Sequence, residues 1–388
     1  MANTLTGIIP TLYEALNVIS REMVGFIPAV RRDTNAERAA VNQTVRVPLA
    51  EAGALEAITP AAAPASSGDT TVGYADVTIT ASYAAPIRWT GEEERAVGTN
   101  GTYNRVLADQ FTDAMRKLVN SAEQTIYAAA YKGASRAYGT AGTAPFGTAN
   151  DLTDLANVSR ILDDNGAPIT DRQLVLSSAS MTNLRGKQSV LFKVNEAGSS
   201  DMLRNGMTDR LQNFALRYSG GISQHVKGAG TGYDVDLGAG YVLGDRTIHL
   251  DGGTVNVTGI KAGDCVTFAG DSNIYVVGAG TTEVEADIVL NAPGLRVATL
   301  ADAVEMTIGN SYTANVAFDR NAIVFVSRAP AVPTGGDSAD DSMMITDPVS
   351  GLTFEVRVYR QYRQVKFEVC LAWGAAVIKS AHVATLLG

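Results

Sequence analysis

The feature that most constrains the fold is an unbroken helical pattern over residues 102–132, a stretch that contains no proline and no glycine. Apolar side chains recur there every three or four positions, at Tyr103, Val106, Leu107, Phe111, Met115, Leu118, Val119, Ala122 and Ile126. This spacing places them on one face of an α-helix. Gly133 follows as a typical stop signal. Such a helix would be roughly 45 Å long, so we expect it to act as a spine.

The N-terminal segment also shows helical spacing. Pro10 can occupy the first position of a helix, and the apolar residues after it form one stripe: Leu12, Leu16, Ile19, Met23 and Phe26. The stripe predicts a short amphipathic arm. Two alternatives stay open, since the arm could pack on its own domain or lie on another subunit.

Two strand-like segments, residues 44–49 and 77–83, flank a tract rich in Ala, Pro, Ser and Gly. Alternation of apolar and polar residues is typical of strands, whereas a connection this long without a core pattern is unusual in a compact domain. We therefore expect a long β-hairpin that reaches outward with a flexible tip. A disordered surface loop is the alternative.

From residue 151 on, three kinds of sequence pattern follow one another. Residues 152–184 predict helix, strand and helix in turn, as in an α/β body. Between residues 228 and 310, short strands alternate with glycine turns, which indicates a small inserted antiparallel barrel. From residue 351 on, Phe354, Val356 and Val358 alternate with polar neighbours, so this run predicts a hairpin with one buried face.

Composition excludes several functions. The net charge is −9, from 31 basic and 40 acidic residues, and sequence-specific binding to a phosphate backbone is not expected at this charge. Charged residues interrupt the hydrophobic runs near the N-terminus, which argues against a leader or membrane span. Cys265 and Cys370 lie far apart without metal-ligand spacing, so we expect buried free thiols.

Three segments carry a resemblance to a known family: AFDRNAIVFVSRA (317–329), the closing run GLTFEVRVYRQYRQVKFEVCLAWGAAVIKSAHVATLL (351–387), and VTGIKAGDCVTFAGDSNIYVV (257–277). Together with the order of arm, hairpin, spine helix, α/β body and terminal hairpin, they resemble tailed-phage major capsid proteins of the Hong Kong 97 type. Podophage coat proteins with an inserted β-barrel domain are the most similar in plan.

The resemblance implies an α+β, Hong Kong 97-like capsid fold. Its parts would be an N-terminal arm (1–43), an extended loop hairpin (44–89), a peripheral domain with the spine helix (90–150), a first part of an apical domain (151–227), an inserted β-barrel domain (228–312), a second part of the apical domain (313–350), and a peripheral β-hairpin with the C-terminus (351–388). Some relatives crosslink through a loop lysine. Residues 45–89 contain no lysine, so such a crosslink is not expected.

The implied function is a coat protein that self-assembles into the icosahedral shell around the double-stranded DNA of a tailed phage. The implied partners are copies of the chain in hexamers and pentamers, scaffolding protein and portal during assembly, non-specifically packaged DNA, and a decoration protein as a further candidate, but no membrane. The implied location is the virion capsid, assembled in the host cytoplasm. An encapsulin-like compartment shell and a phage tail or decoration protein remain alternatives.

No enzyme is expected. His225, His249 and His382 lie in unrelated segments without a recognisable catalytic motif, and no catalytic, cofactor-binding or metal-binding residue is assigned. Asp337, Asp340 and Asp341 lack the spacing of a calcium loop, so they predict a solvated loop.

Charged clusters remain as candidates for contacts between subunits, because they could form ion pairs across an interface. They are Arg88, Glu92, Glu93, Glu94, Arg95, Arg357, Arg360 and Arg363. Solvated faces are the alternative reading, since exposed pairs each contribute only about 0 to 1 kcal/mol.

Overall fold

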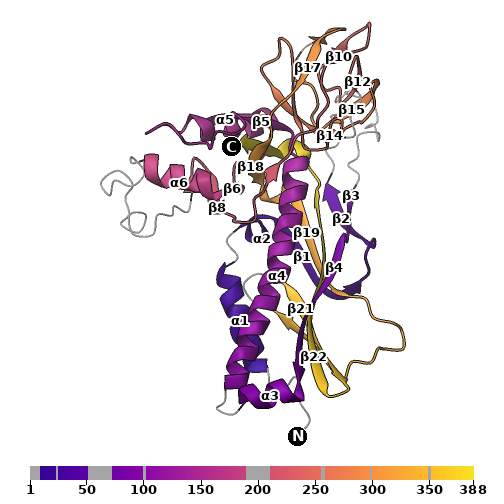
Figure 1. Cartoon of the computed structure of the whole chain (residues 1–388). Helices are drawn as coiled ribbons and strands as arrows, with labels where there is room; N and C mark the ends of the chain where they lie inside the picture. The colour runs from indigo at the N-terminus through magenta and orange to yellow at the C-terminus, as the bar shows by residue number, and fades with distance from the viewer. Residues whose placement is uncertain are drawn as a thin grey trace, which may run out of the picture.

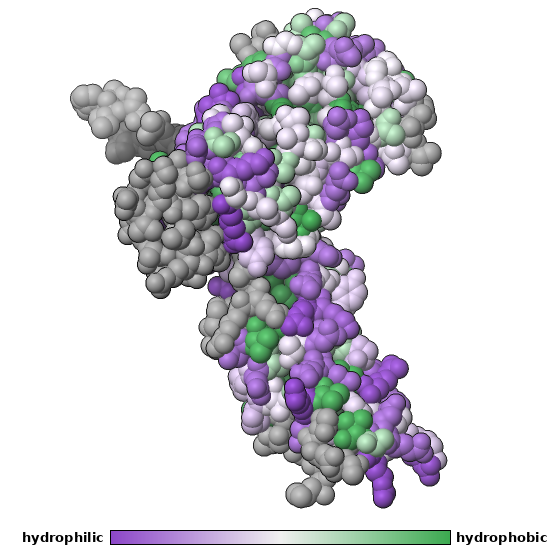
Figure 2. Space-filling model, turned by 60° about the vertical axis from the view of Figure 1, so that its left-hand side comes forward, coloured by the Kyte–Doolittle hydropathy of each residue, from purple (hydrophilic) through white to green (hydrophobic). Residues whose placement is uncertain are grey.

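The protein is elongated, with one long helix running along it (Figure 1). The structure is a computed structural model that describes residues 9–22, 25–50, 72–98, 102–188, 210–254, 258–297, 299–347 and 351–388. A strand-rich lobe lies at one end, and a stalk of helices and long strands forms the other (Figures 1 and 2). The predicted α+β class is confirmed.

Helix α4 (Thr102–Lys132) is the predicted spine, with the predicted bounds. Its apolar face is buried, including Phe111, Met115 and Ile126. Gly133 follows the helix where space is tight: a Cβ there would lie 2.7 Å from Cγ2 of Val377. The stop signal is therefore also a close-packing position, because any larger residue would displace the strand beside it.

Helix α1 (Ile9–Glu22) packs along α4 in the same chain (Figure 1). Leu12, Leu16 and Ile19 of the predicted stripe are buried. Phe26 lies in the short helix α2 (Phe26–Ala29) and is buried as well, while Met23 lies outside the described residues. Of the two alternatives for the arm, packing on its own domain is thus the one observed.

A six-stranded sheet lies against the spine. Its order is β1 (Arg31–Ala39), β19 (Ile323–Pro330), β22 (Gln364–Val377), β21 (Thr353–Gln361) and β20 (Asp341–Thr346), and β4 (Ala81–Thr90) also pairs with β22. The predicted terminal hairpin is β21–β22. Phe354, Val356 and Val358 are fully buried, and so is Glu355, which the alternation placed on the polar face. Its burial is compensated by Arg38 of β1, whose guanidinium donates to both carboxylate oxygens at 2.6 and 3.0 Å.

A second sheet carries the α/β body. Its order is β5 (Arg136–Tyr138), β23 (Val383–Leu387), β18 (Tyr312–Asp319), β6 (Arg172–Leu176), β8 (Phe214–Tyr218) and β7 (Arg210–Leu211). Helices α5 (Thr153–Asp164) and α6 (Ser178–Lys187) accompany it, so the predicted helix–strand–helix order is confirmed.

The expected apical and peripheral ranges do not follow the two sheets. Strands β19 and β20 fall within 313–350, yet they lie in the sheet of the terminal hairpin; β23 falls within 351–388, yet it lies between β5 and β18. The reason is that the chain crosses between the sheets after β18 and again after β22. A division by residue range cannot express such crossings.

The expected barrel is present between β9 (Gln224–His225) and β18. Its strands follow the order β13 (Cys265–Phe268), β17 (Glu305–Ile308), β10 (Tyr233–Val235), β12 (Thr247–Asp251), β15 (Ala286–Leu290) and β14 (Ile274–Ala279), and pairing of β13 with β14 closes it. It has its own core, which includes Tyr233, Ile248 and Ile288. Strand β14 also pairs with β5, which joins the barrel to the second sheet.

The predicted hairpin forms from β2 (Thr44–Ala50) and β3 (Val72–Thr78), which pair only with each other among the described strands. The bounds predicted for its second strand, residues 77–83, are wrong: residues 77–78 end β3, whereas residues 81–83 begin β4, which pairs with β22. At its base, Val77 is buried against the six-stranded sheet, whereas Val72 and Tyr74 toward its far end are exposed. The predicted flexible tip, residues 51–71, lies outside the described residues.

The start of α2 supplies a test of how the arm is fixed. Glu123 of α4 accepts hydrogen bonds from the backbone N–H groups of Phe26 at 2.8 Å and Ile27 at 3.0 Å. Burial raises the pKa of this carboxyl group. We expect Glu123→Ala to lower the free energy of unfolding by about 2 kcal/mol, because two buried donors lose their acceptor.

Glu123→Gln keeps one acceptor oxygen and should cost about half as much. Gln124→Ala, an exposed neighbour on the same helix, is the control and should stay within about 0.5 kcal/mol of the wild type. Urea unfolding of the unassembled chain measures all three. Equal midpoints for Glu123→Ala and Gln124→Ala would contradict the assigned role.

Candidate functional site

Four of the predicted contact residues line one groove at the end of the stalk. Helix α3 (Gly91–Gly98) supplies Glu92 and Glu94, the end of β21 supplies Arg360, and the turn after β21 supplies Arg363. The groove has a volume of about 680 Å³. The backbone N–H of Gly91 donates to the carbonyl of Arg363 at 3.1 Å, which holds the two segments together although they are far apart in sequence. We call this surface the stalk-end groove.

Glu93 has a local role. Its carboxylate accepts hydrogen bonds from the backbone N–H and the hydroxyl of Thr90, both at 2.9 Å, and its own N–H donates to Thr90 Oγ1 at 3.3 Å. These bonds from Thr90 lower the pKa of the Glu93 carboxyl group. This reciprocal pair is a capping box that starts α3. The signal was present in the sequence as Thr-x-x-Glu.

Arg357 is held inside its own chain. Its guanidinium pairs with Asp337 and lies 3.1 Å from the Glu355 carboxylate, and the Tyr359 hydroxyl donates to Asp337 at 2.8 Å. Arg360 pairs with Asp340 at 3.0 Å. Of the three aspartates predicted to lie in a solvated loop, Asp337 and Asp340 are exposed and pair with arginines of β21, whereas Asp341 begins strand β20. Whether these arginines also contact other subunits stays a prediction.

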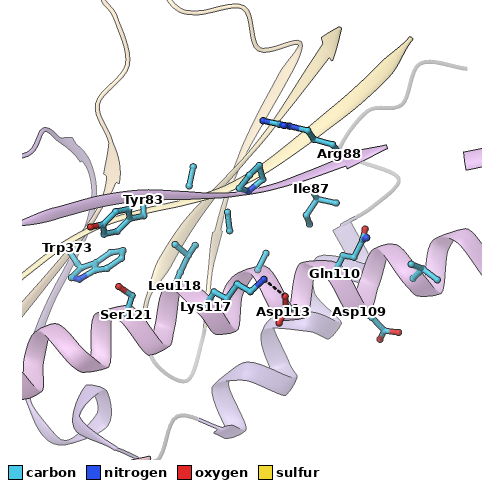
Figure 3. Close-up of a pocket in the computed structure, with 15 residues that line it drawn as sticks. Tyr83, Ile87, Arg88, Asp109, Gln110, Asp113, Lys117, Leu118, Ser121 and Trp373 are labelled. Carbon is cyan, nitrogen blue, oxygen red and sulfur yellow. Dashed lines mark ion pairs between the residues drawn. The ribbon is translucent and has the colours of Figure 1, made fainter. Parts of the chain in front are cut away.

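A second groove runs between β4 and α4, and we call it the spine groove (Figure 3). Its volume is about 720 Å³, and its walls carry Ile87 and Arg88 from β4 and Asp113 and Lys117 from α4, the last two paired at 2.7 Å. On its far side β4 pairs with β22, and among the described strands none pairs with its other edge. An unpaired edge beside an apolar trough can accept another segment.

The exposed ring of Tyr83 marks one end of the spine groove, 5.5 Å from the buried ring of Trp373. Of the remaining predicted contacts, Arg88 lines this groove, and Arg95 lies exposed on α3. The sequence did not reveal the spine groove. Only the packing of a strand from residues 81–90 against a helix from residues 102–132 creates it.

His225 has a partner that its sequence position did not suggest. Its Nε2 lies 2.8 Å from Oδ1 of Asp264, and both residues are buried. Asp264 also accepts the backbone N–H groups of Gly228 at 3.0 Å and Lys261 at 2.8 Å. Both oxygens of the buried Asp264 carboxylate are hydrogen-bonded. The cluster therefore joins the segments where the chain enters the barrel, and His225 is not exposed to solvent.

The cysteines are both free and buried, as predicted. Burial is the largest cause that raises the pKa of Cys265 and of Cys370 to about 12. A thiol with such a pKa is almost entirely protonated at neutral pH, and the protonated form is a poor nucleophile. Among the described helices, none combines the length and apolar character needed to cross a membrane.

Comparison with known proteins gives a likeness in fold alone. No protein-family model and no curated protein sequence matches the chain. Among solved structures, it is similar to the capsid structure of the cyanophage P-SCSP1u, with a TM-score of 0.50 and 9% identity over 94% of this chain and 88% of that one. The predicted resemblance to the Hong Kong 97-type capsid fold is therefore confirmed as a statement about the fold.

Two further matches have lower scores. A structure from Mycobacterium phage Che8 has a TM-score of 0.45 and 13% identity over 89% of this chain and 84% of that one. A virus-like particle from Pyrococcus furiosus has a TM-score of 0.45 and 10% identity over 97% and 98%.

The ion pair between Arg38 and Glu355 gives a stability prediction. Arg38→Ala should lower the free energy of unfolding by about 2 kcal/mol, because the buried Glu355 carboxylate loses the ion pair with Arg38. We expect less than for a fully buried ion pair, because the Arg38 side chain is one-third exposed. Arg46→Ala, which removes the exposed pair with Asp76, is the control and should cost less than about 0.5 kcal/mol. Urea unfolding separates the two, and equal losses would refute the argument.

Thiol accessibility gives a second prediction. Native protein should react with an aromatic disulfide reagent far more slowly than protein in guanidinium chloride, where both thiols become available. The absorbance of the released thiolate measures this. Fast titration of one thiol in the native state would mean that its burial is wrong.

Proposed function

We propose that this chain is the major capsid protein of a tailed phage, and that it self-assembles into an icosahedral shell that encloses double-stranded DNA. The observation that carries the proposal is the fold shared with a cyanophage capsid structure over 94% of the chain. The role is structural, not enzymatic. The proposed location is the virion capsid, reached by assembly in the host cytoplasm.

Two surfaces of the monomer support assembly. The β2–β3 hairpin exposes Val72 and Tyr74 toward its far end, and the spine groove offers an apolar trough beside an unpaired strand edge. These surfaces differ, so a contact between them joins copies head to tail. Contacts of this kind close into rings when the rotation fits. Many weak contacts then give a closed shell its stability.

By this proposal the hairpin laps over a neighbouring subunit, and the predicted charged residues lie between copies in hexamers and pentamers. The stalk-end groove presents carboxylates of α3 and the guanidinium groups of Arg360 in β21 and Arg363 in the following turn on one surface. Such a surface is complementary to a second copy that presents the same charges in reverse order. Scaffolding protein, portal and decoration protein are proposed partners, and the DNA is bound without sequence preference.

Electron microscopy of the chain, expressed alone and with its neighbouring genes, tests the function. Closed isometric particles of uniform diameter are expected. Shells that contain proteins and no DNA would favour an encapsulin-like compartment, and small discrete oligomers in both preparations would favour a tail or decoration protein.

Charge reversal tests the two grooves. Arg88→Glu and Arg363→Glu should each strongly reduce the yield of closed particles without changing the unfolding midpoint, because like charges placed together at an interface cost several kcal/mol. Arg160→Glu on α5, which is exposed and lies outside both grooves, is the matched control. Particle counts by microscopy and unfolding in urea give the two readouts; unchanged yields in both groove variants would remove these residues from the interface.

A further inference from the structure

The outer face of the inserted barrel carries a two-row pattern of ionisable side chains. Strand residues alternate between core and surface, and Val235, Leu250 and Ile288 point into the barrel core. Their neighbours therefore point outward. The strand register places His249 opposite Asp287, and the backbone N–H of Asp236 donates to the carbonyl of His249 at 3.1 Å.

One row thus reads Asp236, His249, Asp287 across three adjacent strands. A second row beside it contains Glu305, Asp234 and Asp251, since Asp234 pairs with both of the others. Glu285 lies two residues before Asp287 and completes the patch. The barrel lies in the lobe opposite the stalk end, and hydrophilic side chains are visible on that lobe in Figure 2.

Three of these residues bring one ligand atom each to a common point. Nε2 of His249 lies 3.7 Å from Oε1 of Glu285 and 3.9 Å from Oδ2 of Asp236, and all three ligand atoms lie within 4.8 Å of one another. These distances are too long for hydrogen bonds. The two distances from Nε2 are a few tenths of an ångström longer than the spacing of ligands around a tetrahedral ion, because metal–ligand bonds of about 2.1 Å separate neighbouring ligand atoms by about 3.4 Å. Small movements of the exposed carboxylates would bring all three ligands to one ion.

The other nitrogen of the histidine is fixed independently. Nδ1 of His249 lies 2.6 Å from Oδ1 of Asp287, so Nε2 is left facing Asp236 and Glu285. Metal-binding histidines characteristically donate their second ring N–H to a carboxylate, which sets the tautomer and the ring orientation. The backbone is held too, because the His249 N–H donates to the Tyr241 hydroxyl at 2.7 Å.

The electrostatic field of the patch favours a cation. Asp236, Glu285 and Asp287 surround the His249 ring, and the row beside them contains three further carboxylates. A divalent ion is attracted to such a concentration of negative charge, because its charge neutralises part of the patch.

We propose that Asp236, His249 and Glu285 form a binding site for a divalent transition-metal ion of the zinc class, with Asp287 as the residue that orients the histidine. One histidine and two carboxylates are a donor set that such ions accept. Solvent would supply the fourth ligand. The site lies within the barrel of one chain and does not depend on the proposed function.

Titration of tag-free, full-length chain with Zn²⁺ tests the site, with Co²⁺ as a spectroscopic probe. We expect about one equivalent per chain, visible absorption typical of low-coordinate Co²⁺, and a Zn²⁺-dependent rise in the unfolding midpoint. His249→Gln and Glu285→Gln should each weaken binding at least about tenfold, and Asp287→Asn should weaken it less while leaving one equivalent bound.

Glu305→Gln is the matched control. It removes the same charge from the same patch, but β17 lies two strands from β12, about 10 Å away, so Glu305 cannot reach the same ion. Unchanged binding in this variant supports the coordinated site. Equal weakening by Glu305→Gln and Glu285→Gln would show only a diffuse acidic patch, and absence of stoichiometric binding to the folded wild type would overturn the proposal outright.

Discussion

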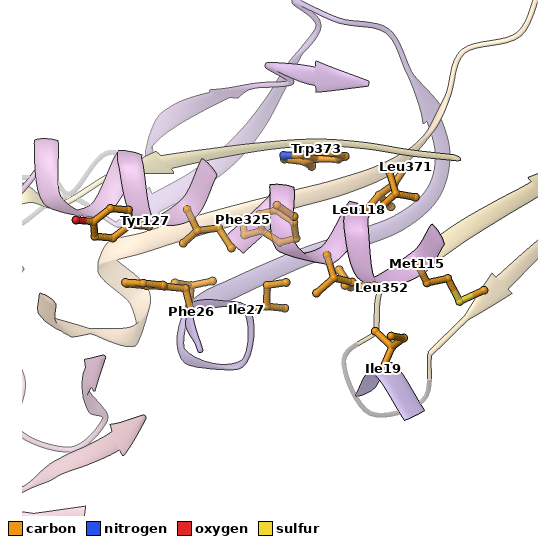
Figure 4. Packing of buried hydrophobic residues seen from close by; sticks show 14 of the residues in the cluster. Ile19, Phe26, Ile27, Met115, Leu118, Tyr127, Phe325, Leu352, Leu371 and Trp373 are labelled. Atoms are coloured by element: carbon orange, nitrogen blue, oxygen red, sulfur yellow. The ribbon is translucent and has the colours of Figure 1, made fainter. Parts of the chain in front are cut away.

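The buried apolar face of α4 is the constraint on which the rest of the structure depends. The arm helix packs on it from one side, and the long strand β22 packs on it from another. Phe111 meets Phe367 of β22 with ring centroids 5.6 Å apart, and Phe26 meets Tyr127 at 5.8 Å. Figure 4 shows that the side chains of this cluster come from both ends of the chain. The helix therefore brings together segments whose local secondary-structure preferences alone would not place them in contact.

The barrel depends on the same helix in a different way. The barrel contacts the end of α4, where the ring of Tyr131 lies against His225. There the buried Asp264 lies within hydrogen-bonding distance of His225 and accepts the backbone N–H of Gly228. A hydrogen-bonded carboxylate at a buried junction fixes orientation more than it adds stability, since its desolvation offsets much of what the bonds contribute. The barrel, which has its own core, is thus joined to the rest of the chain by these buried contacts and by the pairing of β14 with β5.

Much of the fold could be predicted because its elements carry clear periods. The spine helix, the body order and the barrel follow from repeats of about 3.6 or 2 residues and from glycine turns. The expected apical and peripheral ranges differ from the sheet membership of β19 and β23, because no local pattern marks where the chain crosses between sheets. Glu355 shows the same limit: alternation placed it on the polar face, whereas an arginine more than three hundred residues away compensates its burial.

The sequence by itself determined the elements and the charge, because propensity and periodicity act within a few residues. The capping box of Glu93 belongs to this class. Only the tertiary structure decided which side chains meet: the spine groove, the His225–Asp264 pair, and the gathering of Asp236, His249 and Glu285. The physical reason is register. Strand pairing places residues from separate segments about 5 Å apart on one face, and a single sequence does not state which strands pair.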